Sequence, residues 1–364
     1  MRGPDYTGGG IVNVIAELER RMTGDAPSPG LHDSLAAEIP EADRYVLVIF
    51  DGLGDHQLHH PAAAPLAESR RAAIDASFPT TTTVSLATLA TGLPPAGHGL
   101  LGYQMWLPQA GQVVATIKWT TLWGEPVEVD HDAFLPETTW ERLAAAGCEP
   151  VVLQPANFEG SHLTRVLYRG SRFEGYHDMG EAVAAAADLA APPGRLVVLY
   201  VPHVDFAAHV AGQDSADYAE AMAVAAEVWV RLGHRLPAGA VAVGIADHGH
   251  VDVPVERRAL IDKADHEGRI FAGDARAPFV HGEGAELAGR LPARWVPRSE
   301  MEAWWGPGPR HPEFERRAPD GVLVVEPGHA VLHRFSDDRL IGQHGGLTPE
   351  ELEVPLLVAA SPRG

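Results

Sequence analysis

The chain has 364 residues, of which 45% are hydrophobic, and its formal net charge at pH 7 is −21. This length allows one large α/β domain or two modest ones, and the ordinary hydrophobic fraction excludes an intrinsically disordered chain. The acidic charge disfavours a nucleic-acid polymer as a general partner because like charges repel, whereas a small phosphorylated substrate remains compatible with it.

Two further features indicate a cytoplasmic protein. The single cysteine, Cys148, excludes an intramolecular disulfide framework and fits a reducing compartment. The first residues lack the basic-then-apolar order of a secretory signal, and no apolar run approaches the roughly 20 residues that span a bilayer. We therefore expect a cytoplasmic protein without a membrane partner, whose oligomeric state these features leave open.

Helices and strands alternate along most of the chain. Helical spacing of apolar residues predicts helices over 11–22, 84–91, 138–146 and 214–232. We expect Asp214 to cap the last of these and Gly233 to end it. Apolar runs predict strands over 45–50, 196–201, 241–246 and 355–360, and residues 348–351 have the pattern of a helix capping box. This order predicts a mostly parallel central sheet with helices on both faces.

The alternation breaks between residues 255 and 338. This stretch contains short candidate strands at 269–271, 321–325 and 330–333, one candidate helix near 284–291, and a proline-rich segment at 304–309. We expect a smaller α+β subdomain over 255–338, inserted into a catalytic α/β domain formed by 1–254 and 339–364. Both ends of the insertion must return to the candidate site, so we expect it to border the substrate cleft.

Carboxylate and imidazole side chains follow the predicted strands. Each has an ordinary alternative role, such as a turn cap, a surface contact or a structural hydrogen bond. In open α/β sheets, however, ligands bind beyond the carboxyl ends of the strands, and these side chains suit zinc and related ions. Together they predict a site for two divalent ions. The residues are Asp51, Asp205, His209, Asp247, His248 and His344.

Four consecutive threonines, 80–83, precede the predicted helix over 84–91. The backbone N–H groups and the dipole at a helix N-terminus favour an anion. Threonines also cap helices routinely, which is the structural alternative. A hydroxyl beside a divalent metal loses its proton more easily and becomes a nucleophile. The residues alone do not distinguish which of the four threonines would act in this way.

Several motifs resemble the type I phosphodiesterase/nucleotide pyrophosphatase family of the alkaline phosphatase superfamily, over about residues 45–360. They are Phe-Pro-Thr-Thr-Thr at 78–82, Thr-Gly-Leu through His-Gly at 91–99, Asp-x-x-x-His at 205–209, Asp-His-Gly at 247–249 and His-Gly at 344–345. The resemblance implies an alkaline-phosphatase-like fold with Thr82 as the nucleophile. It also implies one zinc ion held by Asp205, His209 and His344, and a second held by Asp51, Asp247 and His248. Manganese or another divalent ion is the alternative.

The chain departs from the family pattern at two positions. Ser85 stands where the nucleotide pyrophosphatases have an asparagine, and His250 stands where methionine is usual after Asp-His-Gly. The first change implies altered phosphate binding, whereas the second is expected to affect packing.

We therefore expect a two-metal phosphodiesterase or nucleotide pyrophosphatase, since no arginine near Thr82 in sequence could neutralise the additional charge of a monoester. A phosphomonoesterase or a phosphomutase-like member of the superfamily is the alternative. A non-catalytic metal-binding relative is disfavoured, because all six ligands and the threonine are present. Candidate substrate contacts are Thr83, Ser85, Lys118, Trp119 and His203.

Overall fold

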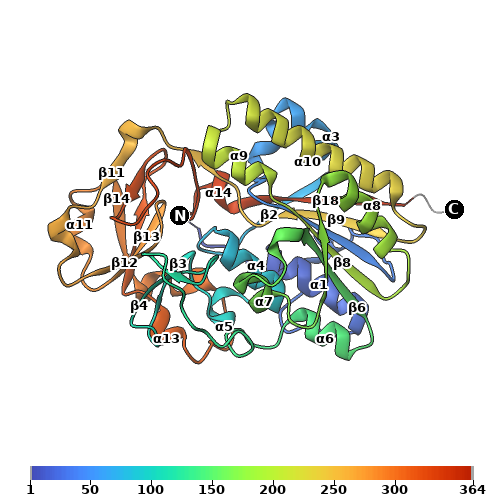
Figure 1. Ribbon diagram of the computed structural model, residues 1–364, viewed down its shortest axis with the longest axis horizontal. Coiled ribbons are helices and arrows are strands. Elements are labelled where there is room, and N and C mark those ends of the chain that lie inside the picture. The colour runs from blue at the N-terminus through green and yellow to red at the C-terminus, as the bar shows by residue number, and fades with distance from the viewer. Residues whose placement is uncertain (1, 362–364) are drawn as a thin grey trace.

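The computed structural model describes residues 2–361, and at its centre lies a seven-stranded sheet (Figure 1). Only β18 runs antiparallel to its neighbours, so the predicted mostly parallel sheet is confirmed. The strand order is β2 (Arg70–Asp75), β18 (Glu353–Ala360), β9 (Val241–Ala246), β1 (Tyr45–Phe50), β8 (Arg195–Val201), β6 (Glu149–Pro155) and β7 (Arg172–Tyr176).

Helices cover both faces of this sheet (Figure 1). One layer contains α3 (Ala64–Ser69), α8 (Met179–Leu189), α9 (His203–Ala211) and α10 (Ala216–Arg235). The other contains α1 (Ile11–Thr23), α4 (Thr82–Thr91), α6 (Thr139–Ala145) and α7 (His162–Leu167). Shorter helices are α2 (Asp33–Ala36), α5 (Pro95–His98) and α14 (Pro349–Leu352). Short 3₁₀ helices span His56–His59, Pro61–Ala63, Ala156–Phe158, Val255–Arg257, Lys263–His266 and Glu302–Trp305.

The predicted ends of α10 are wrong. Its N-cap is Ser215, whose side chain accepts the N–H of Tyr218, and the helix continues through Gly233 to Arg235. The helix continues through Gly233 because its apolar face, which includes Leu232, is buried. The stability gained from this packing outweighs the cost of glycine in a helix, which is about 1 kcal/mol.

The capping box predicted at 348–351 is also not formed. The Thr348 hydroxyl donates to the Glu351 carboxylate instead of capping the helix. The same carboxylate also accepts hydrogen bonds from the guanidinium of Arg276.

The segment from residue 255 to 338 contains a separate antiparallel sheet. Its order is β12 (Ile270–Asp274), β13 (Ala277–His281), β15 (Gly321–Val325) and β14 (Ala293–Pro297). Short helices α11 (Ala285–Ala288), α12 (Arg298–Met301) and α13 (Phe314–Arg317) accompany it, and β11 (Arg258–Leu260) pairs with β16 (Ala330–Leu332). Outside the segment, β10 (Val251–Asp252) pairs with β17 (Gly342–Gln343). Phe271, Val280 and Leu323 belong to a small hydrophobic cluster distinct from the main core.

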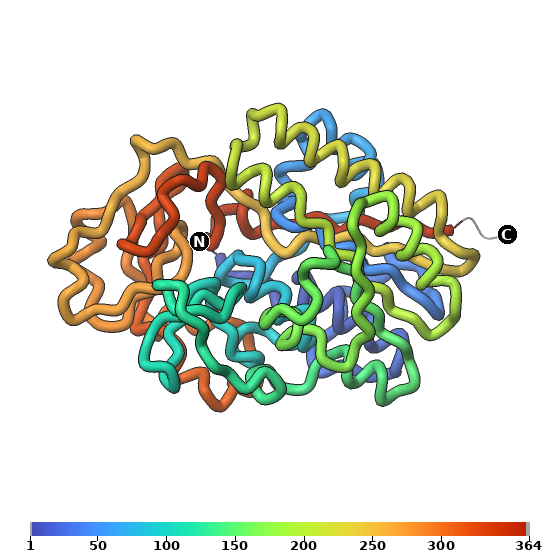
Figure 2. The backbone as a smooth tube through the Cα atoms, in the orientation of Figure 1, coloured from blue at the N-terminus to red at the C-terminus, as the bar shows by residue number. Residues whose placement is uncertain are grey.

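A three-stranded sheet that the sequence patterns do not predict lies beside this segment (Figure 2). It contains β3 (Gln104–Leu107), β4 (Gln112–Ala115) and β5 (Thr120–Thr121). These strands have two to four residues each, too few for a clear periodicity. Within residues 2–361, no helix has the length and apolarity needed to cross a membrane.

Candidate metal centre

Three central strands end at one level of the sheet. Phe50 of β1 is in register with the last residues of β8 and β9, so the polar residues that follow these strands meet at one edge. Asp51 and Asp247 come directly after β1 and β9, and Asp205 lies in the first turn of α9. Gly52 has φ 72°, and a Cβ there would lie 2.7 Å from the Cβ of Asp205. Glycine at this position therefore permits Asp205 to approach.

The three carboxylates each keep one oxygen without a hydrogen bond. Asp247 Oδ1 accepts the backbone N–H groups of Gly52 at 3.1 Å and His248 at 3.0 Å, and Asp51 Oδ2 accepts the hydroxyl of Tyr200. Asp51 Oδ1, Asp247 Oδ2 and Asp205 Oδ1 are buried and have no hydrogen-bond partner among residues 2–361. Burial, with the charges of Asp247 and Asp205, raises the pKa of Asp51 well above its usual value. Bound cations would satisfy these oxygens.

The three histidines are oriented by backbone carbonyls. His248 Nδ1 donates to Gly249 O at 3.0 Å, and His344 Nδ1 donates to Thr80 O at 2.9 Å. His209 Nδ1 donates to Gly342 O at 2.7 Å. Because a carbonyl can only accept, each Nδ1 carries the proton and each Nε2 retains a lone pair. This is the usual arrangement of a metal-binding histidine.

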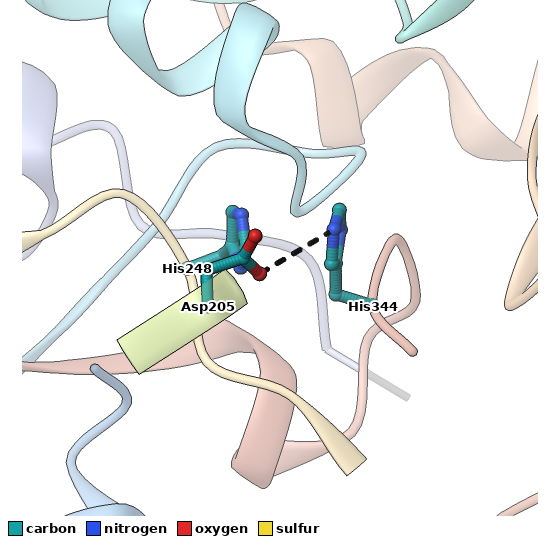
Figure 3. Close-up of side chains that lie close together, drawn as sticks. All are labelled: Asp205, His248 and His344. Atoms are coloured by element: carbon teal, nitrogen blue, oxygen red, sulfur yellow. Dashed lines mark ion pairs between the residues drawn. The ribbon is translucent and has the colours of Figure 1, made fainter. Parts of the chain in front are cut away.

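The ligand atoms form two groups around His248. In one, His248 Nε2 lies 3.6 Å from Asp51 Oδ1 and 3.7 Å from Asp247 Oδ2. The other contains Asp205, His248 and His344, with Asp205 Oδ1 4.0 Å from His344 Nε2 (Figure 3). His209 lies beside the second group, its Nε2 3.3 Å from Asp205 Oδ1. These donor types suit divalent cations, and His248 belongs to both groups.

Thr82 is the first residue of α4 and faces this cluster, with Oγ1 3.2 Å from His248 Nε2. Its neighbours have other partners. The Thr80 hydroxyl donates to Gly346 O, and the buried Thr83 hydroxyl bonds to Thr116. Thr81 Oγ1 lies 3.5 Å from Asp274 Oδ1.

A cavity of about 350 Å³ opens onto Thr82, Asp205, His209 and His344. Residues 273–275 and 335–337, from the segment between 255 and 338, form part of its wall. None of the described residues that line it is an arginine or a lysine. The described lining of this cavity therefore supplies no fixed positive charge to a substrate.

The candidate substrate contacts lie outside the lining of this cavity. Thr83, Ser85 and Trp119 are buried, and Lys118 is exposed. His203 lines a different hollow beside Pro202. The cavity is therefore formed without these five residues.

Other residues form the wall instead, and these were not predicted. They include Tyr103, Gln104, Asp274, Phe335 and Asp337. Burial raises the pKa of Asp274 to about 7. Neither motif nor periodicity marks these residues, because distant segments bring them to the cavity.

Comparisons with known proteins identify the family and the fold. A family model described as type I phosphodiesterase/nucleotide pyrophosphatase matches residues 45–347. None of the curated proteins matches the chain in sequence. Among solved structures, the fold is similar to that of murine ectonucleotide pyrophosphatase/phosphodiesterase 5, an inactive variant in complex with AMP. The TM-score is 0.67 at 20% identity, over 87% of this chain and 88% of that one.

Two further structures show the same fold. Human ectonucleotide pyrophosphatase/phosphodiesterase 5 has a TM-score of 0.66 and 19% identity, over 87% of this chain and 88% of that one. Phosphonoacetate hydrolase from Sinorhizobium meliloti 1021, in complex with phosphonoacetate, has a TM-score of 0.64 and 17% identity, over 89% of this chain and 92% of that one.

Proposed function

The chain belongs to the type I phosphodiesterase/nucleotide pyrophosphatase family, and from this premise we propose that it is a two-metal phosphodiesterase with Thr82 as its nucleophile. Asp51, Asp247 and His248 would hold one ion. Asp205, His209 and His344 would hold the other. The observation that carries this proposal is the set of three buried, unpartnered carboxylate oxygens beside the Thr82 hydroxyl. Zinc is the proposed metal, since the ligands are histidine nitrogens and carboxylate oxygens.

The reaction would proceed in two steps at Thr82. Its oxygen forms a bond to phosphorus while the bond from phosphorus to the departing alcohol oxygen breaks, and the threonine proton ends on that alcohol, giving a phosphothreonine and an alcohol. The oxygen of a water molecule then bonds to phosphorus while the bond from phosphorus to the Thr82 oxygen breaks. This step releases the phosphomonoester, and a proton from the water restores the Thr82 hydroxyl. Bound divalent ions would supply positive charge that favours the deprotonated threonine and balances charge on the phosphoryl oxygens.

The backbone around Thr82 also favours binding of the phosphoryl group. Thr82 and Thr83 are the first two residues of α4, so their N–H groups have no acceptor within the helix. The helix dipole adds partial positive charge at this end. A phosphoryl oxygen that approaches Thr82 can therefore accept hydrogen bonds from these N–H groups.

The charge of the cavity favours a diester. A phosphomonoester dianion needs more neutralisation than a diester monoanion, and the described lining contains carboxylates but no arginine or lysine. A small molecule rather than a nucleic-acid polymer fits a net charge of −21. A cytoplasmic location, which the single cysteine favours, stays a prediction.

The experiment compares kcat/KM of the zinc-loaded protein on bis(p-nitrophenyl) phosphate and on p-nitrophenyl phosphate. We expect the diester to be preferred by at least tenfold. A preference for the monoester would contradict the proposal and assign the chain to the phosphomonoesterase alternative.

A further inference from the structure

His250 is a buried histidine that lies beside the candidate metal centre. It follows Asp247, His248 and Gly249 in the chain and is 1% exposed. Its Nδ1 donates to the backbone oxygen of Gly52 at 2.8 Å. Because a carbonyl can only accept, Nδ1 carries the proton. The sequence pattern indicates packing at this position, whereas the structure shows a directed hydrogen bond to the loop after β1.

Gly52 lies next to all three carboxylates of the centre. It directly follows Asp51, and its N–H donates to Asp247 Oδ1 at 3.1 Å. A Cβ at Gly52 would lie 2.7 Å from the Cβ of Asp205. A shift of this one residue would therefore change the positions or the contacts of Asp51, Asp247 and Asp205.

The hydrogen bond from His250 fixes Gly52 relative to β9. The other donor to Gly52 O is the N–H of Gly54 at 3.2 Å, which belongs to the same loop and so cannot hold the loop against another part of the sheet. His250, in contrast, belongs to the segment that follows β9. Gly52 is thus held through its oxygen by His250 and through its N–H by Asp247.

His250 is itself held from two sides. Gln57, in the 3₁₀ helix His56–His59, donates through its side chain to His250 O at 2.8 Å. The ring of Tyr218 in α10 stands edge-on to the imidazole, with the centroids 5.5 Å apart. Both neighbours are buried. The imidazole therefore has little freedom to turn, and its N–H points in a fixed direction.

From these contacts, and resting on the proposed two-metal function, we propose that His250 is a positioning residue for the ion held by Asp51, Asp247 and His248. Its N–H holds Gly52, whose own N–H engages Asp247 Oδ1 and leaves Oδ2 free for the ion. Loss of a group that orients metal ligands typically lowers metal affinity by about 10- to 100-fold.

The effect should fall mainly on one of the two proposed ions. Asp51 and Asp247 belong to the same proposed ligand set, and Gly52 is joined to the first through the chain and to the second through a hydrogen bond. In the other set, only Asp205 approaches Gly52 closely, whereas His209 and His344 donate to the backbone oxygens of other residues.

Competition between metal-free protein and a chromogenic zinc chelator measures the affinity for each equivalent of zinc. His250→Met fills a similar volume but has no N–H to donate. We expect it to bind one equivalent at least tenfold more weakly than the wild type, and to bind the other with unchanged affinity.

Two smaller side chains separate the hydrogen bond from the packing. His250→Asn places an amide N–H close to the position of the imidazole Nδ1, whereas His250→Ala has no side-chain donor. Both leave space around the residue, so the comparison stays valid if His250→Met does not pack. We expect the asparagine variant to retain most of the zinc affinity and the alanine variant to lose it. The control is His333→Met, which replaces a histidine that is 2% exposed and packs beside Phe271 and Phe335.

Wild-type affinity for both equivalents in His250→Met and His250→Ala would overturn the proposal. So would a loss in His250→Asn as large as the loss in His250→Ala, because the N–H would then be irrelevant. An equal loss for both ions, or a similar loss in His333→Met, would also overturn it by showing a general effect on the fold.

Failure here differs from failure of the hydrolase proposal. A protein that hydrolyses diesters with two zinc ions but is insensitive to His250→Met retains the hydrolase function and lacks this positioning residue. A protein that loses affinity for one zinc ion in His250→Met but hydrolyses no diester retains the positioning residue and lacks the hydrolase function. A wild-type chain that binds no zinc would overturn both proposals.

Discussion

In the proposed mechanism, Thr82 acts as the nucleophile and is not one of the residues that hold the metal ions. The hydroxyl would attack phosphorus, whereas carboxylates and imidazoles would hold the ions. Thr82→Ala should therefore lower kcat/KM on a diester by about a thousandfold or more while zinc content stays unchanged. Thr82→Ser should retain part of the activity, because it keeps a hydroxyl at the same position.

The matched control is Thr83→Ala, which removes a hydroxyl bonded to Thr116 in the core. We expect it to cost about 1 kcal/mol of stability and to leave turnover largely intact. If Thr83→Ala or Thr81→Ala were inactive while Thr82→Ala remained active, the assignment of the nucleophile would be wrong.

His98 should make the protein sensitive to acid. Burial, with the neighbouring charges of His311 and Arg317, lowers the pKa of His98 to about 3. Its ordinary value is about 6.5, so the unfolded chain takes up a proton that the folded chain excludes between these pH values. The stability contribution is complete above pH 6.5 and is lost as the pH falls, by about 2 kcal/mol at pH 5.

Urea unfolding at pH 7 and pH 5 measures this loss. His98→Gln, which removes the titrating group, should reduce the pH dependence by about that amount, whereas Gln at the exposed His177 should not. An identical pH dependence in wild type and His98→Gln would contradict the expectation.

Among the helices and strands, the buried pair Arg276–Glu351 joins the segment 255–338 to α14. Arg276 lies between β12 and β13, both side chains are fully buried, and the guanidinium donates to the two Glu351 oxygens at 3.2 and 3.0 Å. Glu351 also accepts the N–H of Gly346, two residues after the proposed metal ligand His344. Arg276→Met should therefore cost about 3–5 kcal/mol, because it leaves a buried carboxylate unpaired.

Two comparison variants test the physical reason for that cost. Arg290→Met breaks a pair with Asp265 at the protein surface and should leave stability nearly unchanged. Adding Glu351→Leu to Arg276→Met should recover stability, since the unpaired charge is removed. No recovery in the double variant would show that packing, rather than the charge, accounts for the loss.

The strands differ in how far local sequence determines them. The apolar runs at 45–50 and 241–246 are buried along their whole length and match β1 and β9 residue for residue. β2 reads Arg-Arg-Ala-Ala-Ile-Asp and forms only because it pairs with β18 at the edge of the sheet. β7 reads Arg-Phe-Glu-Gly-Tyr and likewise lacks an apolar run, so its strand structure depends on pairing with β6 in the sheet.

The same contrast explains what could be predicted of the site. All six proposed ligands follow central strands or lie in short motifs, so residue type and position relative to a strand predict them. Asp274, Phe335 and Tyr103 reach the cavity through contacts between segments far apart in the chain. Such packing leaves no periodic pattern, and the candidates Lys118 and Trp119 were chosen from local sequence alone.

Across the whole molecule, binding of a phosphorylated substrate requires positive charge at one point of an acidic protein. The net charge is −21, and the cavity beside Thr82 has carboxylates but no arginine or lysine in its described lining. An anionic substrate would be repelled from this cavity unless cations were bound there. The two groups of ligand atoms around His248 provide places for such cations.

Titration of metal-free protein with zinc measures whether cations are needed at this cavity. Bound zinc is measured by elemental analysis, and diester hydrolysis is measured in the same samples. We expect both to rise together and to reach a plateau at two equivalents of zinc per chain. Saturation at one equivalent or none, or full hydrolysis by the metal-free protein, would contradict this expectation.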